Sequence, residues 1–302
     1  MAIVWGGWAA RDAYYKQRVG IDLSRSGKVF TAKYYVETTG SMYYNGYTLN
    51  RGGNITGGVS FNWNTGGANT MLVNTATFTG AAGTTCTFTA SLKLFWGGTA
   101  SVSRSGSIPI DKPGAPTSVS ATRASDTQAN LSWNYSSPSS APVQAVAVER
   151  TDVTSNYGTW KRVATLNPAK KAWTDTGIKA GNRYQWRIRT GNSSGDSAWT
   201  ASARVSTTPL PPTNVKAQKN TDGSITVSWT PPTASYGTSF YIFDNGAQVG
   251  TIARDQTSWT HSSPSTSVAH TYTVRTREDT GSLTSADSAP SNTVQLLAAP
   301  SA

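Results

Sequence analysis

The sequence is short of the side chains that most catalytic and metal sites use. Among 302 residues there is one cysteine, Cys86, and there are two histidines, His261 and His270. A single cysteine excludes a disulfide within the chain, and a zinc site normally takes three or four closely spaced ligands. We therefore expect no metal site, no cofactor and no catalytic residues, and we expect both histidines to be structural.

Charged side chains are scarce as well, at 14% of the chain, although the formal net charge is +11. Residues 1–112 carry 10 basic and 4 acidic residues, residues 113–208 carry 11 and 5, and residues 209–302 carry 5 and 6. The basic residues are scattered, with no run longer than Lys170-Lys171, which favours a solvated β-surface and no specific nucleic-acid partner. Contact of the two basic segments with anionic cell-wall polymers stays open.

Long apolar runs are missing too. No stretch approaches the roughly 18 apolar residues that a transmembrane helix needs. Residues 1–20 lack the apolar run behind a basic start that marks a secretory signal. We therefore expect no membrane insertion, and synthesis in a cytoplasm without export by the common route.

The pattern that the sequence does contain is the alternation of apolar and polar residues that is typical of β-strands. Cys86, Phe88, Ala90, Leu92 and Leu94 alternate with threonine, serine and lysine. We expect Cys86 to be a buried residue of a strand rather than a reactive thiol, which needs exposure and a basic neighbour. Similar alternation recurs along the chain, whereas helical periodicity does not, so we predict an all-β fold.

Two proline-rich joints, at residues 108–117 and 206–213, divide the chain, and the sequence after the first joint repeats after the second. A Pro-x-x-Val-x-Ala motif and a strand tryptophan recur 96 residues apart, and a strand tyrosine recurs 88 residues apart. The repeated residues are Pro116, Val119, Ala121, Trp133 and Tyr184, matched by Pro212, Val215, Ala217, Trp229 and Tyr272. Asp222-Gly223 and Asn245-Gly246 predict hairpin turns.

Each repeat resembles a fibronectin type III domain in these three marks. The resemblance implies an immunoglobulin-like Greek-key sandwich, in which the tryptophan centres the core and the tyrosine makes a corner hydrogen bond. The first 110 residues contain about seven or eight strand-like segments separated by glycine pairs, which predicts a third β-sandwich. The expected fold class is all-β, with three β-sandwich domains in series. The predicted parts are a first sandwich at 1–110, fibronectin type III domains at 113–208 and 209–297, and a C-terminal tail at 298–302.

The first segment, with "RVGIDLSRSGKVFTAKYYVETTG", resembles the N-terminal domains of minor tail proteins in phages of actinobacteria. That resemblance implies a non-enzymatic virion protein, made in the host cytoplasm and located in the tail. Its first domain would dock on the virion, and its fibronectin modules would project toward the host surface. The implied partners are other virion proteins, copies of the chain in a homo-oligomer, and host cell-wall glycans.

Two other functions stay open. The chain could be a capsid decoration or head-fibre protein, or the carbohydrate-binding accessory region of a secreted polysaccharide-degrading enzyme. Glycoside hydrolysis itself needs two facing carboxylates, for which Asp22 and Glu37 are a conceivable pair without a supporting motif. Sugar binding needs only exposed aromatic rings with polar rims. The candidate rings are Tyr43, Tyr15, Trp5, Trp8 and Trp160.

The stretch "GSMYYNGYTLNRGG", residues 40–53, combines three tyrosines with an Asn-Gly pair. Asn45-Gly46 predicts a two-residue type I′ hairpin turn. Tyr43 would then be an exposed aromatic contact on one face of the hairpin. The opposite face would carry an apolar ladder in a core or an oligomer interface, formed by Met42, Tyr44, Tyr47 and Leu49.

Overall fold

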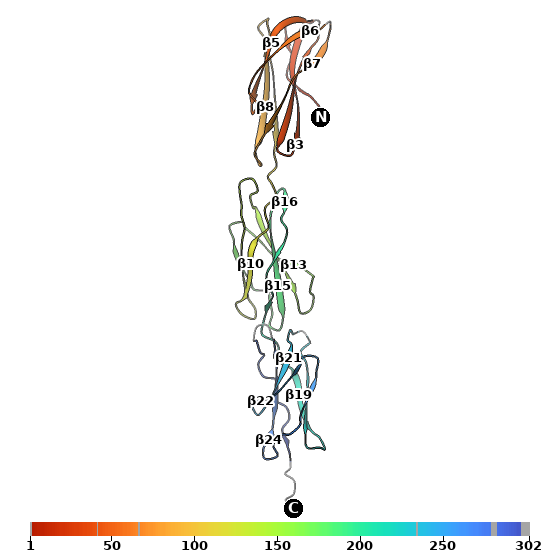
Figure 1. The fold of residues 1–302 in the computed structure, drawn as a ribbon, viewed down its shortest axis with the longest axis vertical. Coiled ribbons are helices and arrows are strands. Elements are labelled where there is room, and N and C mark those ends of the chain that lie inside the picture. The colour runs from red at the N-terminus through yellow and green to blue at the C-terminus, as the bar shows by residue number, and fades with distance from the viewer. Residues whose placement is uncertain (1, 41, 66, 234, 279–282, 297–302) are drawn as a thin grey trace, which may run out of the picture. The chain divides into compact units, whose positions relative to one another are not determined.

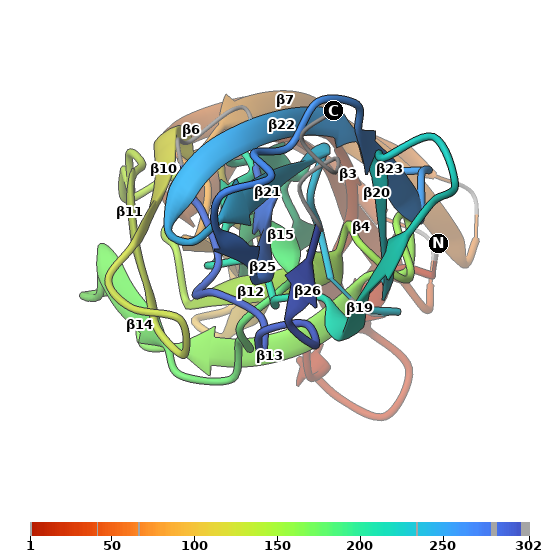
Figure 2. The same ribbon diagram turned by 90° about the horizontal axis from the view of Figure 1, so that it is seen from below.

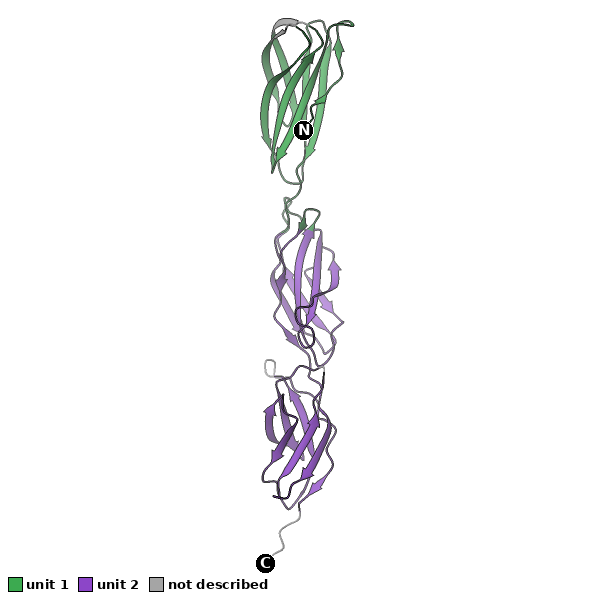
Figure 3. Cartoon of the chain, turned by 90° about the vertical axis from the view of Figure 1, so that its right-hand side faces the viewer, with its two compact units in different colours: residues 1–113, 137–142, 192–195 green, residues 114–136, 143–191, 196–302 purple. Residues whose placement is uncertain are grey.

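The computed structural model describes residues 2–40, 42–65, 67–233, 235–278 and 283–296, apart from the side chains of 42–45 and 63–65. In that description the regular structure consists of strands (Figure 1). It contains no helix with the length and hydropathy that crossing a bilayer requires. The chain divides into two compact units (Figure 3). Unit 1 comprises residues 1–113, 137–142 and 192–195, and unit 2 comprises 114–136, 143–191 and 196–302.

The first unit contains a sandwich of two antiparallel sheets. One sheet has the order β1-β3-β4-β7 with β2 beside β3, and the other has the order β6-β5-β8-β9. The strands of the first sheet are β1 (Val4–Trp5), β2 (Ala9–Ala10), β3 (Lys16–Ser26), β4 (Val29–Thr38) and β7 (Asn69–Thr79). Those of the second are β5 (Met42–Gly53), β6 (Gly57–Thr65), β8 (Thr85–Lys93) and β9 (Thr99–Ser107).

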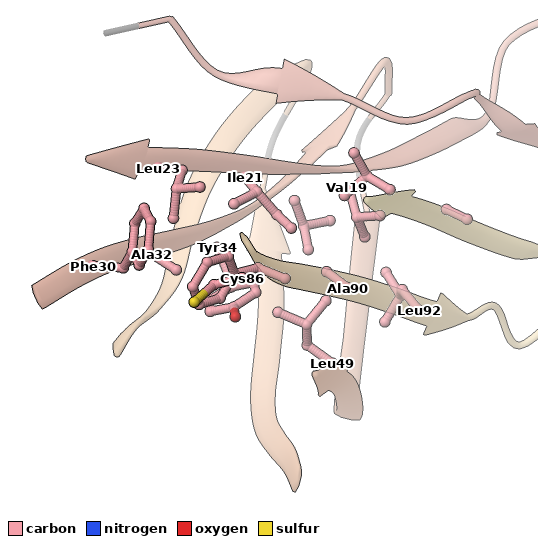
Figure 4. Packing of buried hydrophobic residues seen from close by; sticks show 14 of the residues in the cluster. Val19, Ile21, Leu23, Phe30, Ala32, Tyr34, Leu49, Cys86, Ala90 and Leu92 are labelled. Carbon is pink, nitrogen blue, oxygen red and sulfur yellow. The ribbon is translucent and has the colours of Figure 1, made fainter. Parts of the chain in front are cut away.

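The inner faces of these two sheets meet in one hydrophobic core. Figure 4 shows side chains of β3 and β4, among them Ile21 and Phe30, pointing toward those of β5 and β8. Cys86 is only 2% exposed, and Phe88 packs edge-on against Phe30 with 5.3 Å between ring centroids. The alternate residues of β8 up to Leu94 are buried as well, which confirms the alternation predicted from the sequence. The cysteine is therefore a small core residue.

Strand β5 shows that the hairpin predicted at Asn45-Gly46 is wrong. The strand covers residues 42–53 without reversing, and a bulge in its pairing with β6 absorbs the Asn-Gly pair. Gly46 has a φ of 86°, and its amide donates a hydrogen bond to Asn62 Oδ1 at 3.0 Å. A bulge uses the same left-handed glycine conformation as a type I′ turn, so the pair needs no chain reversal.

Because of the bulge, the tyrosines have cross-strand partners that differ from those of the predicted hairpin. Tyr44 pairs with Trp63 and Tyr47 with Phe61, so the two tyrosines do not face each other. Tyr47 is 3% exposed and stacks on Phe61 at 5.5 Å, and Leu49 is fully buried. These two residues belong to the core of the first sandwich. The side chains of the other three predicted residues lie outside the description, namely Met42, Tyr43 and Tyr44.

The second unit contains two sandwiches, and the strands of both are arranged in the same order. Sheets β10-β11-β14 and β13-β12-β15 form the first of them, and sheets β19-β20-β23 and β22-β21-β25 form the second (Figure 2). This order matches an immunoglobulin-like sandwich of the fibronectin type III kind. It confirms the predicted all-β fold class built from β-sandwiches.

The strands of the two sandwiches follow the chain in the same sequence. Those of the first are β10 (Thr117–Arg123), β11 (Ala129–Asn134), β12 (Ala145–Asp152), β13 (Lys161–Leu166), β14 (Ala172–Asp175) and β15 (Arg183–Asn192), followed by the short β16 (Gly195–Asp196), β17 (Thr200–Ala201) and β18 (Val205–Ser206). Those of the second are β19 (Thr213–Lys219), β20 (Ile225–Thr230), β21 (Ser239–Asp244), β22 (Ala247–Ala253), β23 (Ser258–His261), β24 (Ala269–His270), β25 (Tyr272–Arg277) and β26 (Val294–Gln295).

The 96-residue repeat is visible in the backbone as well. Ser118 and Asn214 have φ values of 52° and 53°, and each lies in an interruption of the pairing between the first two strands of its sandwich.

The predicted division at residues 208 and 209 does not separate the two compact units, since both sandwiches belong to unit 2. Asn245-Gly246 forms the predicted two-residue turn, with φ values of 48° and 85°.

The four marker aromatics of the repeats lie inside these sandwiches. Trp133 and Tyr184 are buried in one hydrophobic cluster, and Trp229 and Tyr272 are buried in the other. The hydroxyl of Tyr184 accepts a hydrogen bond from the backbone N–H of Lys179 at 3.1 Å, which is the expected corner bond.

Glycine at position 53 is expected to be required for stability. The change Gly53→Ala should lower the free energy of unfolding by about 3 kcal/mol, because a Cβ there would lie 2.1 Å from the Thr87 carbonyl oxygen at a φ of +77°. Gly27→Ala is the matched control, because Gly27 also has a positive φ (+56°) but has nothing within 4 Å, so about 1 kcal/mol is expected. Urea unfolding followed by tryptophan fluorescence measures both, and equal losses would contradict the role of the backbone contact.

Candidate functional site

A short hairpin between β2 and β3 presents a group of aromatic rings. Its two strands are paired at Ala9 with Gln17 and at Ala10 with Lys16. Inside the loop, Asp12 Oδ1 accepts hydrogen bonds from the backbone N–H of Tyr14 at 2.8 Å and of Tyr15 at 2.9 Å. The hydrogen bond from Tyr15 is the largest cause of a lowered pKa of Asp12, and the hydrogen bond from Tyr14 is the second largest. Both bonds favour the charged carboxylate, which in turn fixes the conformation of the loop.

The rings on this hairpin reach solvent. Tyr14 is 80% exposed, Trp8 40% and Tyr15 38%. Trp8 and Tyr15 were predicted from the sequence as candidates for sugar contact, whereas Tyr14 was not. The signal that could have found it is the aspartate two residues earlier, which favours a side-chain-capped turn. Trp8, Tyr14 and Tyr15 are called the aromatic hairpin below.

Arg18 holds the flank of the aromatic hairpin. Its guanidinium lies 4.4 Å from the ring centroid of Trp8 and 4.6 Å from that of Trp5, and it forms an ion pair with Glu37. Trp5 itself lies over Gly20, where a Cβ would be 2.7 Å from the indole. Trp5 is therefore a packed ring that supports the hairpin, whereas Trp8 keeps an accessible part.

Trp160, another candidate ring, is engaged on the β13-β12-β15 sheet. The guanidinium of Arg187 lies 4.5 Å from the ring centroids of both Trp160 and Trp199. The same guanidinium donates to Glu149 Oε2 at 2.6 Å. Each such cation–π contact contributes about 0.5–1 kcal/mol at a partly exposed site. The arrangement stabilises the sheet and leaves Trp160 half-buried, while the side chain of Tyr43 lies outside the described residues.

The two histidines form a network with Asp244 in the last sandwich. Nδ1 of His270 lies 2.7 Å from Asp244 Oδ2, and its Nε2 lies 2.7 Å from the Ser265 carbonyl oxygen. Because both oxygens accept, both ring nitrogens donate and His270 is an imidazolium. Nδ1 of His261 shares a hydrogen bond of 2.9 Å with the hydroxyl of Tyr272, so this tyrosine bonds a side chain where Tyr184 bonds the backbone.

Burial affects the pKa of both histidines. Burial of the ring lowers the pKa of His270, but the hydrogen bond to Ser265, the hydrogen bond to Asp244 and the charge of that carboxylate outweigh it, so the pKa is raised. For His261 burial dominates, the Asp244 charge opposes it and His270 adds to it, so the pKa is lowered. Folding therefore favours the protonated form of His270 and the neutral form of His261.

Asp244, His261 and His270 are also the one group of potential metal ligands found among the described residues. Their ligand atoms lie within 4.8 Å of one another. Sequence reasoning missed this grouping, because Asp244 comes from a different hairpin. Zinc, however, binds neutral imidazole, and both nitrogens of His270 already donate to oxygen. As it stands, the group is a hydrogen-bonded network of the fold.

The conceivable catalytic carboxylates do not face each other. Asp22 pairs with Lys33 and Glu37 with Arg18 in the β3–β4 ladder, which places them four residue rows apart. At the strand rise this is about 13 Å, wider than the roughly 5–10 Å between the carboxyl groups of a glycosidase pair. Arg104 also lies 3.6 Å from Asp22. The geometry gives no support to hydrolysis at this pair.

Comparison with known proteins finds no family model that matches the chain. Chitinase A1 of Niallia circulans is 28% identical over 196 residues, which cover 61% of this chain and 26% of that enzyme. The chain thus spans about a quarter of the length of that enzyme.

Two solved structures are also similar to the chain. A two-domain fibronectin type III segment of chicken tenascin covers 60% of this chain and 99% of its own, at 18% identity and a TM-score of 0.37. The FN1–FN3 domains of chicken CNTN1 cover 91% and 96%, at 14% identity and a TM-score of 0.32. With scores this low, the fold assignment rests on the strand orders described above.

The histidine network predicts a pH-dependent stability. A group whose pKa is raised by folding stabilises the fold below its unfolded pKa and loses this effect as the pH rises through its folded pKa. In a His261→Gln protein, the free energy of unfolding should therefore fall as the pH rises from about 6 to about 8. Urea titrations across that range measure it. The control is His261→Gln/His270→Gln, in which this slope should vanish, and an unchanged slope in the control would contradict the assignment.

Proposed function

We propose that this chain is a non-catalytic accessory region of a polysaccharide-degrading enzyme, and that the aromatic hairpin binds the insoluble polysaccharide. The observation that carries this proposal is the exposure of Trp8, Tyr14 and Tyr15 on a loop that Asp12 and Arg18 hold in shape.

The physical basis of binding is the amphipathic character of these rings. A tryptophan or tyrosine face offers apolar contact to the C–H face of a sugar, while its polar atom and the neighbouring charged groups bond the hydroxyls. Large apolar side chains that remain exposed often mark a binding surface. Because Asp12 orders the loop before any ligand arrives, little conformational freedom is lost on binding.

The relative adds the substrate class. Its name is that of a chitinase, and only about a quarter of its length resembles this chain. We therefore take chitin as the first polysaccharide to test. The β-sandwiches of unit 2 would serve as spacers in such a protein, since this kind of fold does not itself imply a chemical function.

A second proposed function is that of a phage virion protein, in which the same β-sandwiches would be part of the virus particle. It rests on the sequence resemblance of residues 1–110, and the comparisons lend it no support. In that setting the first domain would dock on a phage tail or, alternatively, on the capsid, and the chain would form a homo-oligomer. Virions that lack the protein would decide the matter under the electron microscope, because missing tail or head protrusions would establish the virion role and its place.

Removal of the exposed rings should weaken binding to polysaccharide. The change Trp8→Ala/Tyr14→Ala should reduce the affinity of the whole chain for insoluble chitin by about tenfold or more, since each ring contributes about 0.5–1.5 kcal/mol. Co-sedimentation with chitin and with isolated bacterial cell walls measures the bound fraction at increasing concentrations of polysaccharide.

Phe95→Ala is the matched control in the same sandwich. Phe95 is 52% exposed but lies outside the aromatic hairpin, so its removal should leave binding unchanged. Equal weakening by Phe95→Ala would show that retention is unspecific. Wild-type protein that sediments with neither polymer would refute the proposal.

A further inference from the structure

A hollow of about 330 Å³, lined mainly by charged and polar residue types, opens at one end of the sandwich formed by residues 117–206. Its volume is at the lower end of the range of about 300–1,000 Å³ that is usual for ligand sites. The residues that line it are Arg150, Asp152, Asn156, Thr159, Lys161, Gly177, Lys179, Asn182 and Tyr184. It is called the cationic hollow below.

The sheet register explains why cations gather there. Lys161, Arg150 and Trp186 occupy one row across β13, β12 and β15. Residues in one row share a face of the sheet, and Trp186 is fully buried in the core. Arg150 and Lys161 therefore lie on the core side of the sheet in the last paired row of β12 and β13, where Arg150 is half-buried and Lys161 is exposed.

The arginine is held rigidly but is not fully used. Its Nη1 donates to Asp175 Oδ2 at 2.8 Å, and its guanidinium lies 5.2 Å from the ring centroid of Tyr184. Asp175 is 3% exposed and also accepts from Trp186 Nε1 at 2.8 Å and from the backbone of Gly177 at 2.9 Å. Three donors thus satisfy the carboxylate, while Nε and Nη2 of Arg150 make no hydrogen bond to the described residues.

The lysines leave the hollow with an excess of positive charge. Lys161 and Lys179 are exposed, and no carboxylate of the described residues forms an ion pair with either. The backbone of Lys179 is fixed by its bond to the Tyr184 hydroxyl. The one carboxylate in the lining, Asp152, accepts from Asn182 Nδ2 at 2.6 Å and from the Thr154 backbone at 2.9 Å. Together with Asp175, which pairs with Arg150, two occupied carboxylates stand against three cations, so the hollow keeps a surplus of positive charge carried by the lysines.

We propose that the cationic hollow binds an oxyanion, a carboxylate or phosphate, on one unit of an acidic glycan. Lys161, Lys179 and the free side of Arg150 would hold the anion. Asn156 and Thr159 in the rim would bond sugar hydroxyls. The anionic charge of the ligand follows from the hollow alone, whereas its glycan nature rests on the proposed function.

The corresponding end of the last sandwich carries different side chains around its tyrosine. Asp152 pairs with Tyr184 across β12 and β15, and Asp244 pairs with Tyr272 across β21 and β25. Against Tyr272, however, the rings of His261 and His270 pack at centroid distances of 6.0 and 6.2 Å. In the last sandwich His261 thus occupies the position that Asp175 has in the other repeat, since each pairs with the equivalent residue of the neighbouring strand.

Calorimetry with the whole chain tests the hollow separately from the aromatic hairpin. The probes are a hyaluronan tetrasaccharide for the carboxylate, a glycerol phosphate oligomer for the phosphate, and a neutral chitin tetrasaccharide. We expect at least one acidic probe to bind, and Lys161→Gln/Lys179→Gln to weaken it at least tenfold. Lys33→Gln/Lys170→Gln removes the same charge elsewhere and should change the affinity less than twofold.

Several results would overturn the proposal. Equal weakening by the two double variants would indicate unspecific charge attraction, and no binding of either acidic probe would exclude the site. Equal affinity for a short polyglutamate would exclude a glycan-specific site. Because Trp8→Ala/Tyr14→Ala leaves the hollow intact, failure of either proposal can be recognised without the other.

Discussion

Each sandwich of this chain depends on one constraint, namely that a sheet can bury only one of its two faces and must find a second sheet to cover it. Residues such as Ile21 and Leu92 meet this constraint from opposite sheets of the first core. The outer faces and the open ends are then left to side chains that solvent can reach. Both candidate binding features lie there, namely the aromatic hairpin beside β3 and the cationic hollow at one end of a sandwich.

The two sandwiches of unit 2 have the same strand order but different side chains at the equivalent end. A row of aspartate and tyrosine crosses the same two strands in both, with Asp152 beside Tyr184 and Asp244 beside Tyr272. In one case the guanidinium of Arg150 lies over the tyrosine ring, and in the other the rings of His261 and His270 pack against it. The strand order therefore constrains the core far more than it constrains the ends, which is where related modules can acquire different ligands.

Much of the fold could be predicted from the sequence, because alternation and repetition are local properties of the chain. The alternation around Cys86 and the 96-residue offset both have direct counterparts in the structure. The error at Asn45-Gly46 has a physical cause, since a bulge and a tight turn make the same demand on glycine. The candidate sites were harder to predict. The partners of Trp160 and of His270 come from distant strands, and pairing register cannot be read from residue types.

The position of the single thiol has a practical consequence. Cys86 is the only cysteine of the chain, and it lies in the core of the first sandwich, remote in sequence from the other two cores. A thiol reagent can reach it only when that core opens, so the labelling rate reports the local opening equilibrium of one sandwich. The remaining sandwiches stay silent in such an experiment, and the native chain thus carries its own probe for whether its parts open together or independently.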